Sequence, residues 1–125
     1  MYKSEEDYLE LILRIKQRKG IVRAVDVAAG KGVSKPSVSR AVGVLKDKGY
    51  ITIADDNDIQ LTAAGEDKAS EVYGRHTLLT NFFVLITGVP AEQAEQNACR
   101  VEHDIDRDVV AGIRRFMKTR ERDGN

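Results

Sequence analysis

The sequence predicts a mainly α fold: an N-terminal winged helix-turn-helix with a small two-stranded hairpin, followed by an all-helical subdomain. Three observations predict this fold. Apolar residues recur at helical spacing in three segments before residue 50. Two short alternating segments then flank a polar turn, which is typical of a hairpin. Helical spacing returns from Ala63, so we expect domains at 1–63 and 64–125.

Start and stop signals delimit the elements. Ser4 opens a capping box, and Ser34 caps a later helix that has Pro36 in its first turn. Lys31-Gly32-Val33 makes the turn before that helix, and Gly88-Val89-Pro90 ends an apolar segment at 82–86. In chain order, we expect helices at about 4–19, 24–30 and 34–49, strands at 50–53 and 59–62, and helices at about 63–80, 91–104 and 106–121.

Composition limits the class of protein. The 125 residues suffice for one modest core, and no apolar run approaches the ~20 residues of a membrane span. The N-terminus lacks the basic-then-apolar order of a secretion signal, and the single cysteine cannot form an internal disulfide. We therefore expect a cytoplasmic protein.

Charge is unevenly distributed, although its formal sum is zero. Residues 1–50 hold 11 basic and 6 acidic side chains, whereas residues 51–125 hold 9 basic and 14 acidic ones. A basic front half suits a polyanion such as DNA, and an acidic rear half suits bound cations. Ordinary solvated charge is the alternative.

The third expected helix has the composition of a DNA-recognition helix. Its apolar side chains share one face, and the opposite face carries short polar and long basic side chains that can reach a groove. We assign base contact to Arg40 and phosphate contacts to the serines. The hairpin tip is acidic and would repel phosphates, so we expect no insertion of the wing into the minor groove. The expected DNA-binding residues are Ser34, Lys35, Pro36, Ser37, Ser39 and Arg40, and the acidic tip residues are Asp55, Asp56 and Asp58.

Cys99, Glu102 and His103 are spaced i, i+3 and i+4, so on a helix they project from one face. Thiol, carboxylate and imidazole groups bind divalent transition metals. Three further candidates lie far upstream and would join such a site only through the fold: Asp7, Glu10 and His76. The candidates also have ordinary alternative roles: Asp7 as a capping acid, Glu10 as a solvated side chain, His76 as an interfacial histidine and Cys99 as a small buried thiol.

These motifs resemble the diphtheria toxin repressor family. The similarity spans nearly the whole chain and is carried by residues 33–39, by Arg75-His76, and by the Cys-Arg-x-Glu-His motif within residues 98–103. The resemblance implies a metal-activated, dimeric transcriptional repressor of iron or manganese homeostasis. Its helical subdomain would then be the metal-binding and dimerisation subdomain.

Two branches of the family are combined in this sequence. Cys99 resembles the iron-responsive branch, whereas Asp7 and Glu10 resemble the manganese branch, in which a glutamate replaces the cysteine. The sequence ends at Asn125, so it resembles the short, manganese-type members without an SH3-like domain. An ancillary site like that of the iron branch would here use His76, Glu95 and Glu10. The implied metal ligands are Asp7, Glu10, His76, Glu95, Cys99, Glu102 and His103.

The resemblance also implies a cofactor and partners. We expect Fe(II) or Mn(II) as the physiological metal, and Zn(II), Co(II) or Ni(II) as ions that bind in vitro. Metal would fix the two recognition helices of a homodimer one helical turn, or a multiple, apart on a palindromic DNA operator. Apolar side chains of the helical subdomain are expected to form the dimer interface or, alternatively, only the monomer's own core: Leu78, Leu79, Phe82, Phe83 and Ile86.

Other functions are open at this point. The main alternative is a metal-independent winged-helix regulator that responds to a small molecule bound near Phe82 and Phe83. A zinc hydrolase would also use histidine, cysteine and glutamate, but no general base or substrate cleft is evident, so we expect no enzyme. A protein-interaction module would show no affinity for DNA at any metal level.

Overall fold

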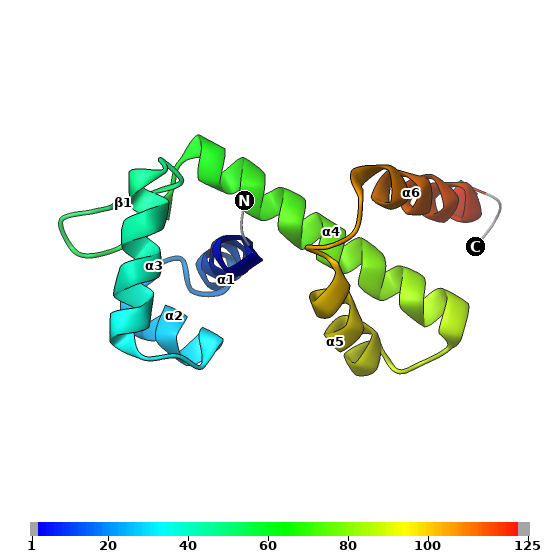
Figure 1. Cartoon of the computed structure of the whole chain (residues 1–125), viewed down its shortest axis with the longest axis horizontal. Helices are drawn as coiled ribbons and strands as arrows, with labels where there is room; N and C mark the ends of the chain where they lie inside the picture. The colour runs from blue at the N-terminus through cyan, green and yellow to red at the C-terminus, as the bar shows by residue number, and fades with distance from the viewer. Residues whose placement is uncertain (1–2, 123–125) are drawn as a thin grey trace. The chain divides into compact units, whose positions relative to one another are not determined.

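The computed structural model describes residues 3–122 of the chain. They divide into two compact units, one reaching to Glu71 and the other starting at Val72, so that the border falls within one helix. The elements are α1 (Lys3–Lys19), α2 (Ala24–Lys31), α3 (Lys35–Asp47), β1 (Ile51–Ile53), β2 (Ile59–Leu61), α4 (Ala63–Thr87), α5 (Ala91–Val101) and α6 (Arg107–Arg122) (Figure 1). The predicted mainly α fold with one two-stranded hairpin is confirmed. Within the described residues, no helix is both long and apolar enough to cross a membrane.

The first unit contains α1, α2, α3, the hairpin and the first residues of α4 (Figure 1). Gly32 ends α2 with a φ of 71°, and its N–H donates to the carbonyl of Ala28 at 2.9 Å. This left-handed residue lets the chain turn into α3, as predicted. Apolar side chains from each element fill the core, among them Leu9, Ile12, Ile15, Val22, Val27, Val38, Leu45, Ile51 and Ile59.

The two predicted helix caps have different outcomes. Ser34 caps α3 as predicted, because its Oγ accepts a hydrogen bond from the N–H of Ser37 at 3.3 Å. Ser4 does not cap α1, because the helix already includes Lys3. Acidic side chains in the first turn favour a helix N-terminus, so they stabilise a helix that begins upstream of Ser4.

The hairpin is joined to the segment between α1 and α2. Strands β1 and β2 are antiparallel, with Thr52 opposite Gln60. The N–H of Ile59 donates to the carbonyl of Val22 at 2.9 Å, and the N–H of Val22 donates to Asp58 Oδ1 at 2.9 Å. Asp58 therefore holds the hairpin to the core of the unit, whereas Asp55 and Asp56 at the tip are exposed.

The second unit contains the rest of α4 together with α5 and α6, which lie on opposite sides of α4 in Figure 1. The prediction that the long helix ends near residue 80 is wrong. It continues through the apolar segment to Thr87, where Gly88, with a φ of 75°, ends it. Phe82 of α4 and Phe116 of α6 pack edge to face, with ring centroids 6.1 Å apart.

Helix α5 ends at Val101, three residues before its predicted end. The N–H of Asp104 donates to the carbonyl of Val101 at 3.0 Å, and this tighter turn takes the chain out of the helix. Acidic side chains are unfavourable at a helix C-terminus, so Glu102 and Asp104 help to end it. The turn leads to α6.

Gly65 is a position where α4 touches the backbone of the segment before β1. A Cβ at Gly65 would lie 1.9 Å from the carbonyl oxygen of Tyr50, which already accepts the N–H of Thr62 at 3.0 Å. We expect Gly65→Ala to lower the free energy of unfolding by about 2 kcal/mol, as overpacking does. Gly43→Ala is the control. Its Cβ would meet nothing within 4 Å, so it should add up to about 1 kcal/mol in urea unfolding. Equal effects of the two changes would contradict the close contact.

Asp58 should give the protein a pH-dependent stability. The N–H of Val22, and after it the side chain of Gln60, hold the pKa of Asp58 below its ordinary value of 3.8, and partial desolvation opposes them. The contribution is therefore present above the pKa of the unfolded state and is lost as pH falls through the lower folded-state value. We expect Asp58→Ala to lower the melting temperature at pH 7 and to match the parent more closely at pH 3. Asp55→Ala, at an exposed tip position, should change neither. A deficit for Asp58→Ala that is as large at pH 3 would refute this linkage.

Candidate metal centre and nucleic-acid interface

One carboxylate lies between two imidazoles inside the second unit. His76 is on α4, and Glu102 and His103 follow directly after α5. His76 Nδ1 is 2.6 Å from Glu102 Oε2, and His103 Nε2 is 3.2 Å from Glu102 Oε1. The side chains of the three residues are 8%, 0% and 2% exposed, in that order. They therefore form a buried polar cluster.

Small residues on α5 allow this burial. Ala94 and Ala98 are fully buried and lie one turn apart on the same face of α5. The N–H of Glu102 still donates to the carbonyl of Ala98 at 2.9 Å, so Glu102 follows on that face. Glu102 therefore lies on the buried side of the chain, where its carboxylate meets His76 at 2.6 Å.

The cluster fits a divalent cation. A buried carboxylate is costly unless charge or hydrogen bonds compensate it. Among the described residues, Glu102 Oε1 has no hydrogen-bond partner, although His103 Nε2 is nearby. Carboxylate oxygens and neutral imidazole nitrogens are suitable donors to transition metals such as Mn(II), Fe(II) and Zn(II). The donor set is therefore appropriate for such an ion.

Two other predicted ligands are more exposed. Glu95 Oε1 is 3.5 Å from His76 Nε2, and the side chain of Glu95 is 50% exposed. Cys99 is exposed on α5. Helix α5 was predicted to include Cys99, Glu102 and His103, but it ends at Val101, and the side chains of Glu102 and His103 are buried whereas Cys99 is exposed.

The predicted ligands Asp7 and Glu10 are on α1, in the first unit. Glu10 is buried, with 7% of its surface exposed. Asp7 belongs to a run of three acids that form ion pairs with lysines from three other places in the unit. Sequence analysis missed these pairs, since residues 24 or 43 positions apart leave no local pattern. The pairs are Glu5–Lys48 at 2.5 Å, Glu6–Lys68 at 3.4 Å and Asp7–Lys31 at 3.2 Å.

Helix α3 presents the predicted DNA-binding side chains. Arg40 Nη2 donates to Ser37 Oγ at 3.3 Å, and Ser37 Oγ is 3.0 Å from Ser34 Oγ. These three residues follow each other along one face of the helix, while Val38, Val42 and Leu45 are buried on the other. Five of the six predicted residues are exposed, and Ser37 is half-buried: Ser34, Lys35, Pro36, Ser39 and Arg40.

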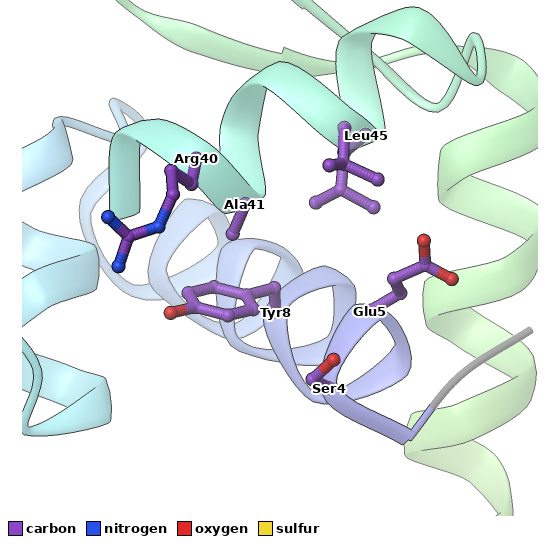
Figure 2. Close-up of a pocket in the computed structure, with 7 residues that line it drawn as sticks. Ser4, Glu5, Tyr8, Arg40, Ala41 and Leu45 are labelled. Atoms are coloured by element: carbon purple, nitrogen blue, oxygen red, sulfur yellow. The ribbon is translucent and has the colours of Figure 1, made fainter. Parts of the chain in front are cut away.

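A small pocket lies between α1 and α3. Figure 2 shows the Tyr8 ring in its middle, with the Arg40 guanidinium at one end and the Glu5 carboxylate at the other. Its volume is ≈ 200 Å³, whereas ligand pockets usually enclose about 300–1,000 Å³. Neither Phe82 nor Phe83 lines it, so it gives no support to a small-molecule site near them. The lining residues are Ser4, Glu5, Tyr8, Arg40, Ala41, Val44 and Leu45.

The predicted dimerisation residues differ in exposure. Leu79 is fully buried, so it packs within its own chain. Leu78, Phe82 and Phe83 are half-buried, and Ile86 is 54% exposed. Two residues of α6 that sequence analysis did not select are also exposed apolar side chains, Val109 and Phe116. The amphipathic spacing of residues 107–122 was the signal that could have found them.

Comparisons with known proteins match both parts of the chain. Residues 1–58 match the family model of the iron dependent repressor, N-terminal DNA binding domain. Residues 62–125 match that of the iron dependent repressor, metal binding and dimerisation domain. The two matches account for nearly the whole sequence.

Individual relatives agree with the family models. Transcriptional regulator MntR of Escherichia coli O6:H1 is 36% identical over 113 residues, which cover 90% of this chain and 72% of the relative. Iron-dependent repressor IdeR of Mycobacterium bovis is 30% identical over 113 residues, covering 90% of this chain and 48% of IdeR. The manganese regulator SloR has a solved structure with a TM-score of 0.81 and 25% identity, covering 91% of this chain and 53% of SloR. The chain thus spans about half the length of IdeR and SloR. These relatives are transcriptional regulators and not enzymes.

Proposed function

Because the chain belongs to the iron-dependent repressor family, we propose that it is a transcriptional repressor that binds operator DNA as a homodimer when it holds a divalent metal ion. The regulated genes are those of iron or manganese homeostasis, by analogy with IdeR and SloR. The observation that carries the proposal is the fully buried Glu102 carboxylate between two imidazoles. A buried negative charge costs stability unless a positive charge compensates it, and a bound cation supplies that charge.

We propose that His76, Glu102 and His103 form the centre of the metal site and that α1 adds Asp7 and Glu10. The family resemblance and the buried position of Glu10 support this assignment. When bound, the metal ion supplies positive charge that neutralises these carboxylates. Glu95 and Cys99 complete the proposed set. The Glu95 carboxylate lies 3.5 Å from His76 Nε2, which supports its place in this set.

Fe(II) or Mn(II) is the proposed physiological metal. A ligand set dominated by carboxylates and imidazoles accepts both ions, and the thiol of Cys99 would favour Fe(II). Zn(II), Co(II) and Ni(II) are expected to bind in vitro whichever ion the cell uses, because affinity follows the Irving–Williams order.

The first 63 residues are the proposed DNA-binding domain. In the proposed complex, α3 enters the major groove and Arg40 contacts a base edge, while Lys35 and the serines at 34, 37 and 39 contact phosphates. A homodimer presents α3 twice, so the operator should be palindromic with half-sites about one helical turn, or a multiple, apart. The apolar side chains proposed for the dimer interface are Leu78, Phe82, Phe83 and Ile86, with Leu79 supporting them from the core.

The direct test is DNA binding with and without metal. An operator is first selected from random DNA with the Mn(II)-loaded protein. Affinity is then measured by fluorescence anisotropy with Mn(II), with Fe(II) under anaerobic conditions, or with a chelator. Metal should increase affinity at least about tenfold, within the usual range of coupling between two sites. Equal affinity in all conditions would favour a metal-independent regulator.

Glu102→Gln should separate metal binding from folding. The amide can still accept a hydrogen bond from His76, but it is a poor metal ligand, so we expect loss of Mn(II) binding in calorimetry and of the metal-stimulated DNA affinity. The circular dichroism spectrum of the metal-free protein should be unchanged. Glu92→Gln, which removes an exposed carboxylate from the first turn of α5, should bind Mn(II) as the parent does. Parent-like Mn(II) binding by Glu102→Gln would refute the proposed site.

Arg40 and Lys35 should affect DNA binding differently. Arg40→Ala should cost about 1–3 kcal/mol on the selected operator and relax selection at one base position in each half-site. Lys35→Gln should weaken binding to all sequences and reduce the slope of log affinity against log salt by about one. Repeated selection and salt titration measure both effects. Unchanged base preference in Arg40→Ala would remove it from the proposed base contacts.

A further inference from the structure

Lys31 differs from the other lysines that pair with the start of α1. Its Nζ is 3.2 Å from Asp7 Oδ2, and it also lies 5.3 Å from the centre of the Tyr8 ring. Both charged side chains are largely shielded, with 27% of Lys31 and 19% of Asp7 exposed. An ammonium held by a carboxylate and by an aromatic face has a defined position. Of the three lysines in these pairs, only Lys31 binds a carboxylate that belongs to the proposed ligand set.

We propose that Lys31 sets the metal affinity of this protein, as a tethered cation that competes with the metal ion for the carboxylate of Asp7. This inference rests on the proposed function, because it requires Asp7 to be a ligand. In the metal-free protein, Lys31 neutralises Asp7 and stabilises the arrangement of α1 and α2. A metal ion bound to the same carboxylate would be repelled by the positive charge of Lys31, whose Nζ is 3.2 Å from Asp7 Oδ2.

The size of the effect follows from the charges. Two like unit charges a few ångströms apart near a protein surface repel each other electrostatically. Partial exposure to solvent and the flexible lysine side chain reduce this repulsion. Repulsion by a divalent ion doubles the charge product, so removal of the lysine charge should tighten metal binding about five- to tenfold. The same removal leaves the other proposed ligands untouched. Lys31 would thereby set the metal concentration at which the regulator responds.

The test measures Mn(II) binding by isothermal titration calorimetry without DNA, so that any contact of Lys31 with DNA plays no part. Lys31→Gln should bind Mn(II) about five- to tenfold more tightly than the parent, whereas Lys31→Arg, which keeps the charge, should bind within about twofold of it. Lys48→Gln is the matched control. It removes the same kind of ion pair from the neighbouring acid Glu5, which is not a proposed ligand, and should leave Mn(II) affinity unchanged.

A double-mutant cycle with Asp7→Asn tests separately whether Asp7 is a metal ligand and whether Lys31 weakens metal binding. Asp7→Asn alone should weaken Mn(II) binding, and Lys31→Gln should have no further effect in that background, because the shared carboxylate is gone. Parent-like affinity of Asp7→Asn would overturn the ligand set and this inference with it. Weaker binding by Asp7→Asn, together with unchanged or weaker binding by Lys31→Gln, would overturn the role of Lys31 alone. Thermal melts of the metal-free variants check that each one is folded.

Discussion

The buried carboxylate of Glu102 is the constraint on which the second unit depends. Its side chain is 0% exposed, and its two oxygens are directed at different histidines. Without compensation, such a group would cost several kcal/mol of stability. Glu102 and His103 follow directly after α5, whose Ala94 and Ala98 are fully buried. A buried carboxylate between two imidazoles suits a cation better than a neutral ligand.

In the first unit, the negative charges of acidic side chains are compensated by lysines. Three consecutive carboxylates at the start of α1 each have a lysine partner, and these lysines come from α2, from the residue after α3 and from α4. These ion pairs link α1 to the rest of the first unit. Glu10, one turn further along α1, is buried as well. A change of charge at Asp7 therefore alters its ion pair with Lys31, which is the last residue of α2 before the turn into α3.

Local signals in the sequence predicted most of the fold. Gly32 and Ser34 delimit the helix-turn-helix correctly, because a left-handed turn and a side-chain cap depend only on neighbouring residues. The end of α5 was predicted three residues late, because helical spacing continues past Val101 whereas the tighter turn from Val101 to Asp104 takes the chain out of the helix. The approach of His76 to Glu102, 26 residues apart, leaves no local pattern in the sequence, so it could be expected only from the fold and from the family resemblance. Spacing and the family motif both selected Cys99, which the fold leaves exposed.

The choice of metal and the threshold of response depend on different residues in this proposal. A buried cluster of oxygen and imidazole donors binds Zn(II) more tightly than Mn(II) or Fe(II), so affinity alone cannot select the latter ions, and selection has to come from ligand number, geometry and supply in the cell. A neighbouring ammonium acts otherwise, because its repulsion depends on the charge of the ion and not on its identity. Lys31 would weaken binding of every divalent ion to the same degree. Sequences that keep the ligands but vary the residue at this position could therefore change the responsive concentration without changing the metal that is sensed.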